Sequence, residues 1–118
     1  MNANLNMPVF NKTKNTVLAK DAEFATSISK RLIGLLKYKE LKSGQALVIR
    51  PCNSIHTFFM RFPIDVIFVD EQNRIVKTIP NLKPWRLTGI YLDAKFCIEL
   101  PAGTIASSHT SIGNSLSF

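Results

Sequence analysis

The chain has few of the residues that build metal sites or disulfide-bonded folds. Its cysteines are Cys52 and Cys97, and neither belongs to a C-x-x-C pair, so they provide neither a zinc-ligand spacing nor a disulfide framework. Its two histidines, His56 and His109, stand in no H-x-x-x-H or H-x-E pattern. We therefore expect no metal site.

Glycine and long apolar runs are scarce as well. The five glycines form no G-x-x-x-x-G-K or G-x-G-x-x-G pattern, so nucleotide binding through a glycine-rich loop is unsupported. No apolar run reaches the roughly 18 residues of a membrane span. The N-terminus lacks the positive and apolar regions of a secretory signal. These absences predict a soluble, cytoplasmic protein with no cofactor and no membrane partner.

Acidic residues are outnumbered, with 8 Asp and Glu against 15 Lys and Arg, which gives a formal net charge of +7. A charge of this sign permits an anionic partner. The basic residues are scattered from Lys12 to Lys95 without a run of five, which favours a solvated surface over a nucleic-acid site. A small-molecule or protein partner remains open.

Apolar residues make up 46% of the 118 residues, enough for the core of one domain. We expect an N-terminal extension at residues 1–15, either frayed or an edge strand, and a single domain at 16–118. Short apolar runs between turn residues predict an α+β fold rich in strands. The strands should be mainly antiparallel and form a barrel-like or strongly curved sheet.

The predicted strands are 16–19 and 22–25 (a pair or one bent strand), 46–49, 55–60, 64–69, 74–79, 96–100 and 115–118. Asp70–Asn73 has the turn chemistry that folds 74–79 back as a hairpin, and 80–88 reads as a loop or irregular edge. One clear helix is expected at about 27–37, where an apolar stripe follows the capping residues Thr26 and Ser27. A short helical turn is expected at about 102–107.

The segment His56–Asp70 has the most informative pattern. After Pro63, the β-branched and aromatic run Ile64–Val69 is typical of a strand. Asp65 has apolar neighbours on both sides, so its carboxylate should lie away from water and needs donors, a cation or a proton. Glu99 is the other acidic residue inside an apolar strand, on the same face as Cys97.

These acidic residues support two hypotheses. In the first, Asp65 and Glu99 act with His56 as a hydrolase-like acid–base site. In the second, which we favour, they are structural ties held by backbone amides or by a nearby arginine. The candidate arginines are Arg31, Arg50, Arg61 and Arg86. The structural set is Arg31, Asp65, Glu99 and Gly103. No catalytic constellation has a convincing spacing, so enzymatic activity stays uncertain.

Binding is the better functional hypothesis: a small soluble binding or interaction module with a pocket near the His56–Asp65 motif. On a strand, His56 would share a face with Phe58 and Met60. Trp85 beside Arg86 offers a face on which a ring can stack. The candidate ligand-binding residues are His56, Thr57, Met60, Arg61, Trp85 and Arg86. Weak nucleic-acid binding through net charge is a third hypothesis.

Six motifs follow one another in a characteristic order. They are S-K-R-L-I-G-L-L at 29–36, I-R-P-C at 49–52, I-H-T-F-F-M-R-F-P-I-D-V-I-F-V-D at 55–70, P-W-R at 84–86, I-E-L-P-A-G at 98–103 and I-G-N at 112–114. Together they resemble the domain of unknown function 192 family, over roughly residues 16–118. The resemblance implies a small β-rich domain with one or two helices and no established activity.

The chain departs from that family in two places. Many members carry an export signal, which this N-terminus lacks. The family usually has Gly-Asp where this chain has Gly113 and Asn114, so any chemical role of that aspartate in relatives is not carried over.

Overall fold

The apolar runs between turn residues become the strands of one sheet. The computed structural model describes residues 7–25 and 41–118, and within these it has seven strands and one short helix. They are β1 (Met7–Asn11), β2 (Thr16–Ala25), β3 (Gln45–Ile49), β4 (Ile64–Val69), β5 (Ile75–Leu82), β6 (Phe96–Pro101), α2 (Thr104–Ser107) and β7 (Leu116–Ser117). The predicted helix at 27–37, including Arg31, lies outside the described residues.

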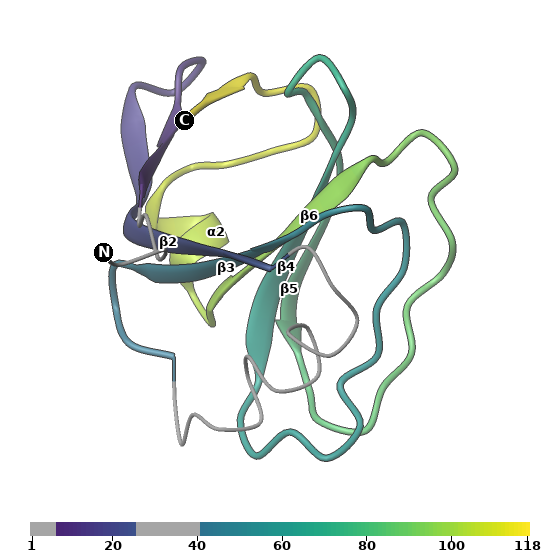
Figure 1. Ribbon diagram of the computed structural model, residues 1–118. Coiled ribbons are helices and arrows are strands. Elements are labelled where there is room, and N and C mark those ends of the chain that lie inside the picture. Colours follow the sequence, from purple (N-terminus) through teal and green to yellow (C-terminus); the bar gives the residue numbers. More distant parts are fainter. Residues whose placement is uncertain (1–6, 26–40) are drawn as a thin grey trace, which may run out of the picture.

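The strands are joined in the order β5-β4-β6-β3-β2-β1-β7. Of the described strand pairs, β2 and β3 are parallel and the others antiparallel. The two end strands also approach each other, because Arg74 and Ser115 form an isolated bridge and the Ile75 amide donates to the Asn114 carbonyl at 2.9 Å. The sheet is therefore a curled half-barrel (Figure 1), which confirms the predicted β-rich fold.

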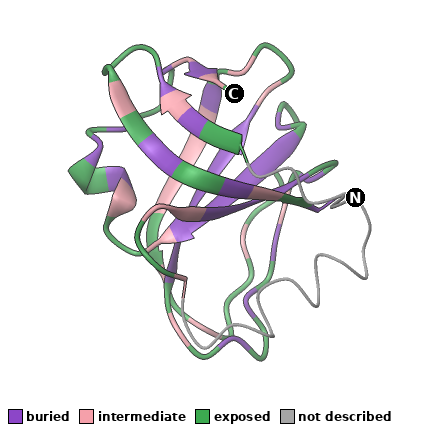
Figure 2. Cartoon of the chain, turned by 60° about the vertical axis from the view of Figure 1, so that its left-hand side comes forward, coloured by how far each residue is buried: buried purple, intermediate pink, exposed green. Residues whose placement is uncertain are grey.

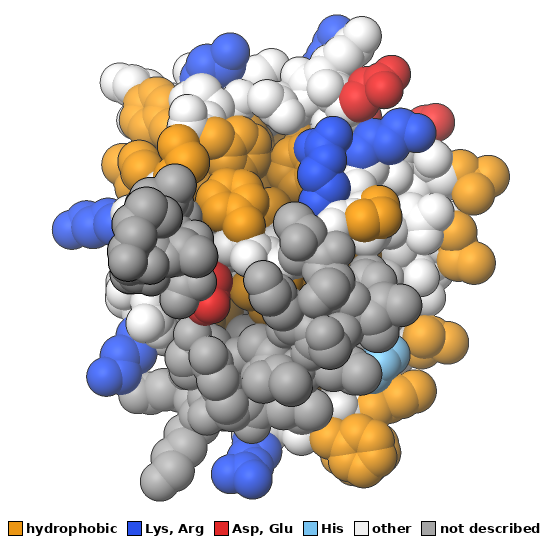
Figure 3. Space-filling view, in the orientation of Figure 1, with side chains coloured by type: hydrophobic (Ala, Val, Ile, Leu, Met, Phe, Trp, Pro, Cys, Tyr) orange, Lys and Arg blue, Asp and Glu red, His pale blue; other side chains and the backbone are white. Residues whose placement is uncertain are grey.

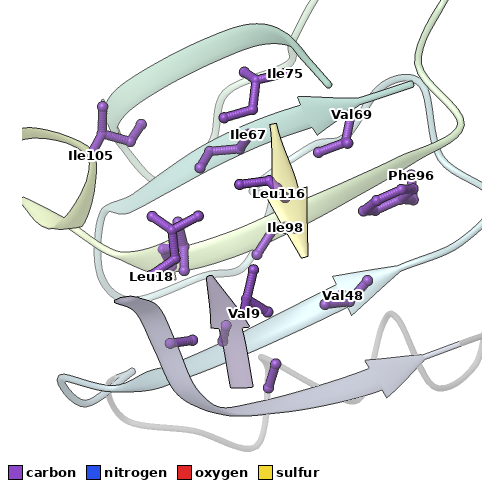
Figure 4. Close-up of a cluster of buried hydrophobic side chains, with 14 residues drawn as sticks. Val9, Leu18, Val48, Ile67, Val69, Ile75, Phe96, Ile98, Ile105 and Leu116 are labelled. Atoms are coloured by element: carbon purple, nitrogen blue, oxygen red, sulfur yellow. The ribbon is translucent and has the colours of Figure 1, made fainter. Parts of the chain in front are cut away.

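The central strands β4 and β6 are buried on both faces. Side chains alternate between the two faces of a strand, so Ile67 and Ile98 belong to one apolar cluster, while Val66 and Cys97 belong to the other. Figure 4 shows the first cluster, where side chains from strands across the sheet converge. Buried residues concentrate in the strands and exposed ones in the connections (Figure 2).

Local turn chemistry fixes the hairpin between β4 and β5. The Asp70 carboxylate accepts the amides of Gln72 and Arg74, each at 2.9 Å. Asn73 has φ 62°, a left-handed conformation that Asn tolerates better than most residues. The turn predicted at Asp70–Asn73 and the antiparallel hairpin are confirmed.

Two elements differ from the expectation. Residues 55–60, predicted as a strand, form an irregular segment with one isolated bridge at His56. Strand β5 runs on to Leu82 through Pro80, which an edge strand tolerates because one side of it needs no amide donors. Strand β2 is a single ten-residue strand, as one of the two alternatives for 16–25 predicted. Residues 7–11, expected to be frayed or an edge, pair with both β2 and β7.

Candidate functional site

Two long connections lie side by side along one side of the molecule. The first loop, residues 52–63, connects β3 to β4, and the second loop, residues 83–92, lies between β5 and β6 (teal and green at the right and bottom of Figure 1). Thr57 joins them, because its amide donates to the Arg86 carbonyl and its own carbonyl accepts the Trp85 amide, both at 2.9 Å. The pairing is irregular, and one isolated bridge, His56 with Leu87, is formed.

The Thr57 hydroxyl completes this junction. It donates to the Lys83 carbonyl at 2.6 Å and accepts the Arg86 amide at 2.9 Å. The side chain is fully buried, and a buried hydroxyl needs such partners. Thr57, predicted to bind ligand, therefore sits beneath the surface and positions the second loop.

Further along, Thr88 and Tyr91 continue the pairing of the two loops. The Ile55 amide donates to the Thr88 hydroxyl at 2.9 Å, and the Thr88 amide donates back to the Ile55 carbonyl at 3.0 Å. The Tyr91 amide donates to the Asn53 carbonyl at 2.9 Å. The two loops thus form one connected layer although they are far apart in sequence.

An aromatic cluster lies on top of this layer, formed by His56, Phe58, Phe59 and Trp85. The His56 and Phe58 rings are stacked at 4.7 Å between centroids, and Phe59 lies 4.7 Å from Trp85 in a tilted arrangement. Phe58 links the two pairs, 6.0 Å from Trp85. Of the three residues predicted to share a face, His56 and Phe58 lie together, whereas Met60 turns into the core because the segment is not a strand.

Two rings of the aromatic cluster are held on strained backbone. Phe59 has φ 68° and Trp85 has φ 64°. In this left-handed region the Cβ of an L-residue is crowded, whereas glycine has no Cβ and adopts the conformation without a steric penalty. A turn closes around Phe59, because the Met60 amide donates to the Thr57 carbonyl at 3.2 Å. Such strain persists where surrounding contacts over-determine the backbone, often at binding sites.

The exposed apolar surface extends beyond the aromatic cluster along the second loop. Five residues, here called the apolar row, expose between 57% and 80% of their surface: Phe59, Trp85, Leu87, Ile90 and Leu92. Hydrophobic side chains project along the right-hand margin of the molecule in Figure 3, where the second loop runs in Figure 1. Sequence reasoning missed the three aliphatic members, whose only signal was the apolar run L-T-G-I-Y-L at 87–92, which begins at the end of the predicted loop 80–88.

The charges on the two loops have one sign. Arg61, Lys83 and Arg86 are exposed, and residues 52–63 and 83–92 contain no Asp or Glu. The first acidic residue after them is Asp93, which is exposed beside the basic Lys95. The candidates Arg61 and Arg86 thus flank the aromatic cluster in sequence, as cations able to meet an anionic group.

The carboxylate of Asp65 accepts two backbone amides, an arrangement of the kind that the structural hypothesis describes. Its Oδ1 accepts the Asn81 amide and its Oδ2 accepts the Ile105 amide, both at 2.8 Å. The carboxylate is fully buried and connects β4 to the end of β5 and to α2. Gly103, at the start of α2, has φ 97°, a conformation that glycine adopts without a steric penalty.

Glu99 lies in a different environment from Asp65. Burial raises the pKa of its carboxyl from the ordinary 4.5 to about 8, and the neighbouring Cys52 adds to the rise. Its Oε2 has no hydrogen-bond partner among residues 7–25 and 41–118. Arg31, one of the four candidate arginines, lies outside these residues. A carboxyl with this raised pKa is mostly protonated at pH 7.

The structure does not bring Asp65 and Glu99 together as a carboxylate pair. In the β4–β6 register, Asp65 lies opposite Leu100 and Glu99 lies opposite Val66. Because neighbouring residues of a strand point to opposite faces, the two carboxyls lie on opposite faces of the sheet. His56 is exposed on the first loop, stacked on Phe58. The hydrolase hypothesis required the carboxyls of Asp65 and Glu99 to lie together, and in the structure they do not.

A depression of about 460 Å³ lies where the first loop begins and the second loop ends. It is lined by residues 51–54 and by Leu92, Ala94 and Lys95, and it contains none of the predicted ligand-binding residues. Within the described part of the chain, no group of three or more His, Cys, Asp or Glu is placed to hold a metal ion. No helix within that part is long and apolar enough to cross a membrane.

The family model of DUF192, described as Uncharacterized ACR, matches residues 9–118. The chain belongs to the DUF192 family. A UPF0127 protein of Pyrococcus horikoshii is 33% identical to this DUF192 chain over 112 residues, which cover 92% of the chain and 96% of that protein.

Two solved structures resemble the DUF192 chain in fold. A protein of unknown function from Novosphingobium aromaticivorans superposes with a TM-score of 0.83 at 19% identity, covering 96% of this chain and 85% of that one. A protein from Sinorhizobium meliloti, named as a candidate transcription regulator, superposes with a TM-score of 0.80 at 17% identity, covering 99% and 96%. At these identities the similarity shows the fold alone.

The structure also explains how this DUF192 chain accommodates Asn114. Its Oδ1 accepts the Asn11 side-chain amide and the Ser111 backbone amide, both at 3.0 Å. Asn11 also donates to the Thr110 hydroxyl at 3.0 Å, within a buried polar cluster. Position 114 needs an oxygen acceptor, which Asn and Asp both provide.

Proposed function

We propose that this DUF192 chain is a recognition module that binds a partner through its aromatic cluster and apolar row. One observation carries the proposal. The rings of Phe59 and Trp85 are held in solvent on left-handed backbone by loops that Thr57 fastens together. A turn with no other task would be less strained with glycine at these positions.

The extent of the exposed apolar surface supports the same conclusion. Single exposed hydrophobic residues are ordinary on a soluble protein, whereas contiguous apolar patches mark interaction sites. Here aromatic and aliphatic residues lie together on two hydrogen-bonded loops. The proposed site is thus a projecting surface, in place of the pocket that the sequence suggested near His56–Asp65. We place the protein in the cytoplasm as part of the same proposal.

Binding fits the buried acidic groups better than hydrolysis does. Both carboxylate oxygens of Asp65 accept hydrogen bonds from backbone amides, so neither oxygen is placed to activate a water molecule. Glu99 lies on the other face of the sheet. The carboxyls of Asp65 and Glu99 therefore cannot act as acid and base on the same substrate.

Trp85 is the single tryptophan of the chain and sits within the proposed surface, so its fluorescence reports binding directly. We would titrate nucleotides, oligosaccharides, acidic peptides and lipid vesicles while following Trp85 emission. For any ligand that shifts the emission, Phe59→Gly should weaken binding by about tenfold or more, as loss of an interface anchor does. Glycine relieves the strain at φ 68°, so this variant should remain folded.

The matched control is Ile112→Ala. Ile112 is 59% exposed, and it belongs to a turn that bonds to Ile75 through Gly113 rather than to either loop. Its substitution should change affinity by less than twofold, the usual range for a residue outside an interface. Ligands that bind Phe59→Gly and wild type equally well, with no change in Trp85 emission, would show that recognition takes place elsewhere.

A further inference from the structure

We propose that the partner of this surface is a lipid bilayer that carries anionic headgroups. The proposal rests on the function proposed above and names the occupant of that site. The apolar row enters the interface between headgroups and acyl chains, while Arg61, Lys83 and Arg86 meet the anionic headgroups. The chain binds the surface of the bilayer through side chains and does not cross it.

The composition of the apolar row favours this occupant. Trp85 is of the kind that settles at headgroup depth, because its indole is apolar with one polar N–H. Phe59 is of the kind that enters the apolar side of that interface. Leu87, Ile90 and Leu92 are more exposed still, and aliphatic side chains gain by leaving water for the acyl region. A single-stranded nucleic acid would use the rings and the cations but offers nothing comparable to the three aliphatic residues.

The shape of the surface points the same way. The hydrophobic side chains project in a row from the margin of the molecule (Figure 3), and the depression beside them contains one member of the row, Leu92. A projecting row suits a partner that deforms around it. Bilayer lipids do so without the matched groove that a rigid protein partner needs for close packing.

Charge complementarity supplies a third argument. The two loops carry three exposed cations and no carboxylate, and the chain has a formal net charge of +7. Anionic leaflets attract basic residues near their surface, and this attraction falls off within a Debye length. Asp93 stands just beyond Leu92, with Lys95 two residues further on. The sequence expectation of no membrane partner considered only spanning segments and leaves surface binding untouched.

The test is co-sedimentation of the purified chain with vesicles, combined with Trp85 emission. Vesicles of phosphatidylcholine with phosphatidylglycerol should bind the chain and shift Trp85 emission to the blue, and pure phosphatidylcholine vesicles should bind it at least about tenfold more weakly. Raising the salt concentration should weaken binding to the mixed vesicles without abolishing it, because the apolar contribution is not screened.

Two double variants separate the two contributions. Leu87→Ser with Ile90→Ser should lower vesicle affinity by about tenfold or more, through loss of buried aliphatic surface. Lys83→Glu with Arg86→Glu should lower it as strongly and remove the preference for anionic lipid. All four side chains are exposed, so the fold should survive, and thermal melts check this. Ile112→Ser is the control and should bind like wild type.

Three outcomes would overturn the lipid proposal. These are no sedimentation with anionic vesicles at low salt, full affinity in the Leu87→Ser/Ile90→Ser variant, and displacement from vesicles by a nucleic acid or an acidic peptide that binds the aromatic cluster more tightly. If vesicles fail but another ligand shifts Trp85 emission and is lost in Phe59→Gly, the recognition surface stands and only its occupant changes. If no ligand depends on Phe59, both proposals fall.

Discussion

Thr57 and Arg86 are joined by hydrogen bonds in both directions. The Thr57 amide donates to the Arg86 carbonyl and the Arg86 amide donates to the Thr57 hydroxyl, each at 2.9 Å, although the residues are 29 positions apart. This reciprocal pair fixes the second loop against the first. The position of Trp85 beside Phe59, and with it the proposed surface, therefore depends on a residue that is itself buried.

Removal of the Thr57 hydroxyl should destabilise the fold. Thr57→Val keeps the shape of the side chain but leaves the Arg86 amide and the Lys83 carbonyl without their partner, which should cost about 1–3 kcal/mol. Thr57→Ser keeps the hydroxyl and should lose less. Denaturant unfolding of the two variants measures the difference, and a Val variant as stable as the Ser variant would contradict this role.

Replacement of Asp65 should also cost stability, since two chain segments are attached to it. Asp65→Ala leaves the Asn81 and Ile105 amides without an acceptor and should lower the free energy of unfolding by roughly 2–4 kcal/mol. Asp65→Asn retains one acceptor oxygen and should lose about half as much. Equilibrium unfolding in urea measures both free energies, and an Ala variant as stable as wild type would rule out the structural tie.

The raised pKa of Glu99 predicts a pH-dependent stability. Between its ordinary 4.5 and about 8 the folded protein keeps a proton that the unfolded chain releases. The contribution is fully present below pH 4.5 and is lost as the pH rises through about 8, so the free energy of unfolding should fall by about 1.4 kcal/mol per pH unit within this window.

Glu99→Gln is the matched variant for that prediction, because it is close in size and carries no titrating proton. The free energy of unfolding of this variant should lack the pH dependence that Glu99 contributes. The difference in stability between the variant and wild type should therefore shift in favour of the variant as the pH rises from 5 to 8. Chemical unfolding at several pH values provides the comparison. Parallel curves for the two proteins would mean that Glu99 is ionised in the folded state.

Position 114 offers a test of a purely structural role. Asn114→Asp keeps the oxygen that accepts from Asn11 and Ser111, so it should change the free energy of unfolding by less than about 1 kcal/mol, whereas Asn114→Ala should cost about 1–3 kcal/mol. Thermal and denaturant melts measure both. If the Asp variant is as unstable as the Ala variant, the site demands more than an acceptor.

Much of the sheet could be predicted because its signals are local. The run Ile64–Val69 consists mostly of residues that pack well on a pleated surface, and Asp70–Asn73 has side chains that bond to the backbone of their own turn. The burial of Asp65 and the opposite placement of Glu99 and Ile98 follow from the two-residue period of a strand. Each of these properties is encoded within a few consecutive residues.

The recognition surface could not be predicted in the same way, because it depends on contacts between distant segments. The register of β4 against β6 sends Asp65 and Glu99 to opposite faces, and a shift of one residue would have reversed the face of either. Residues 55–60 have the composition of a strand, yet Thr57 bonds to the second loop and the segment turns at Phe59. The sequence by itself determined which residues are apolar, basic or turn-forming. Only the tertiary structure decided that Phe59 and Trp85 stand together in solvent, because their positions follow from hydrogen bonds between loops that are distant in sequence.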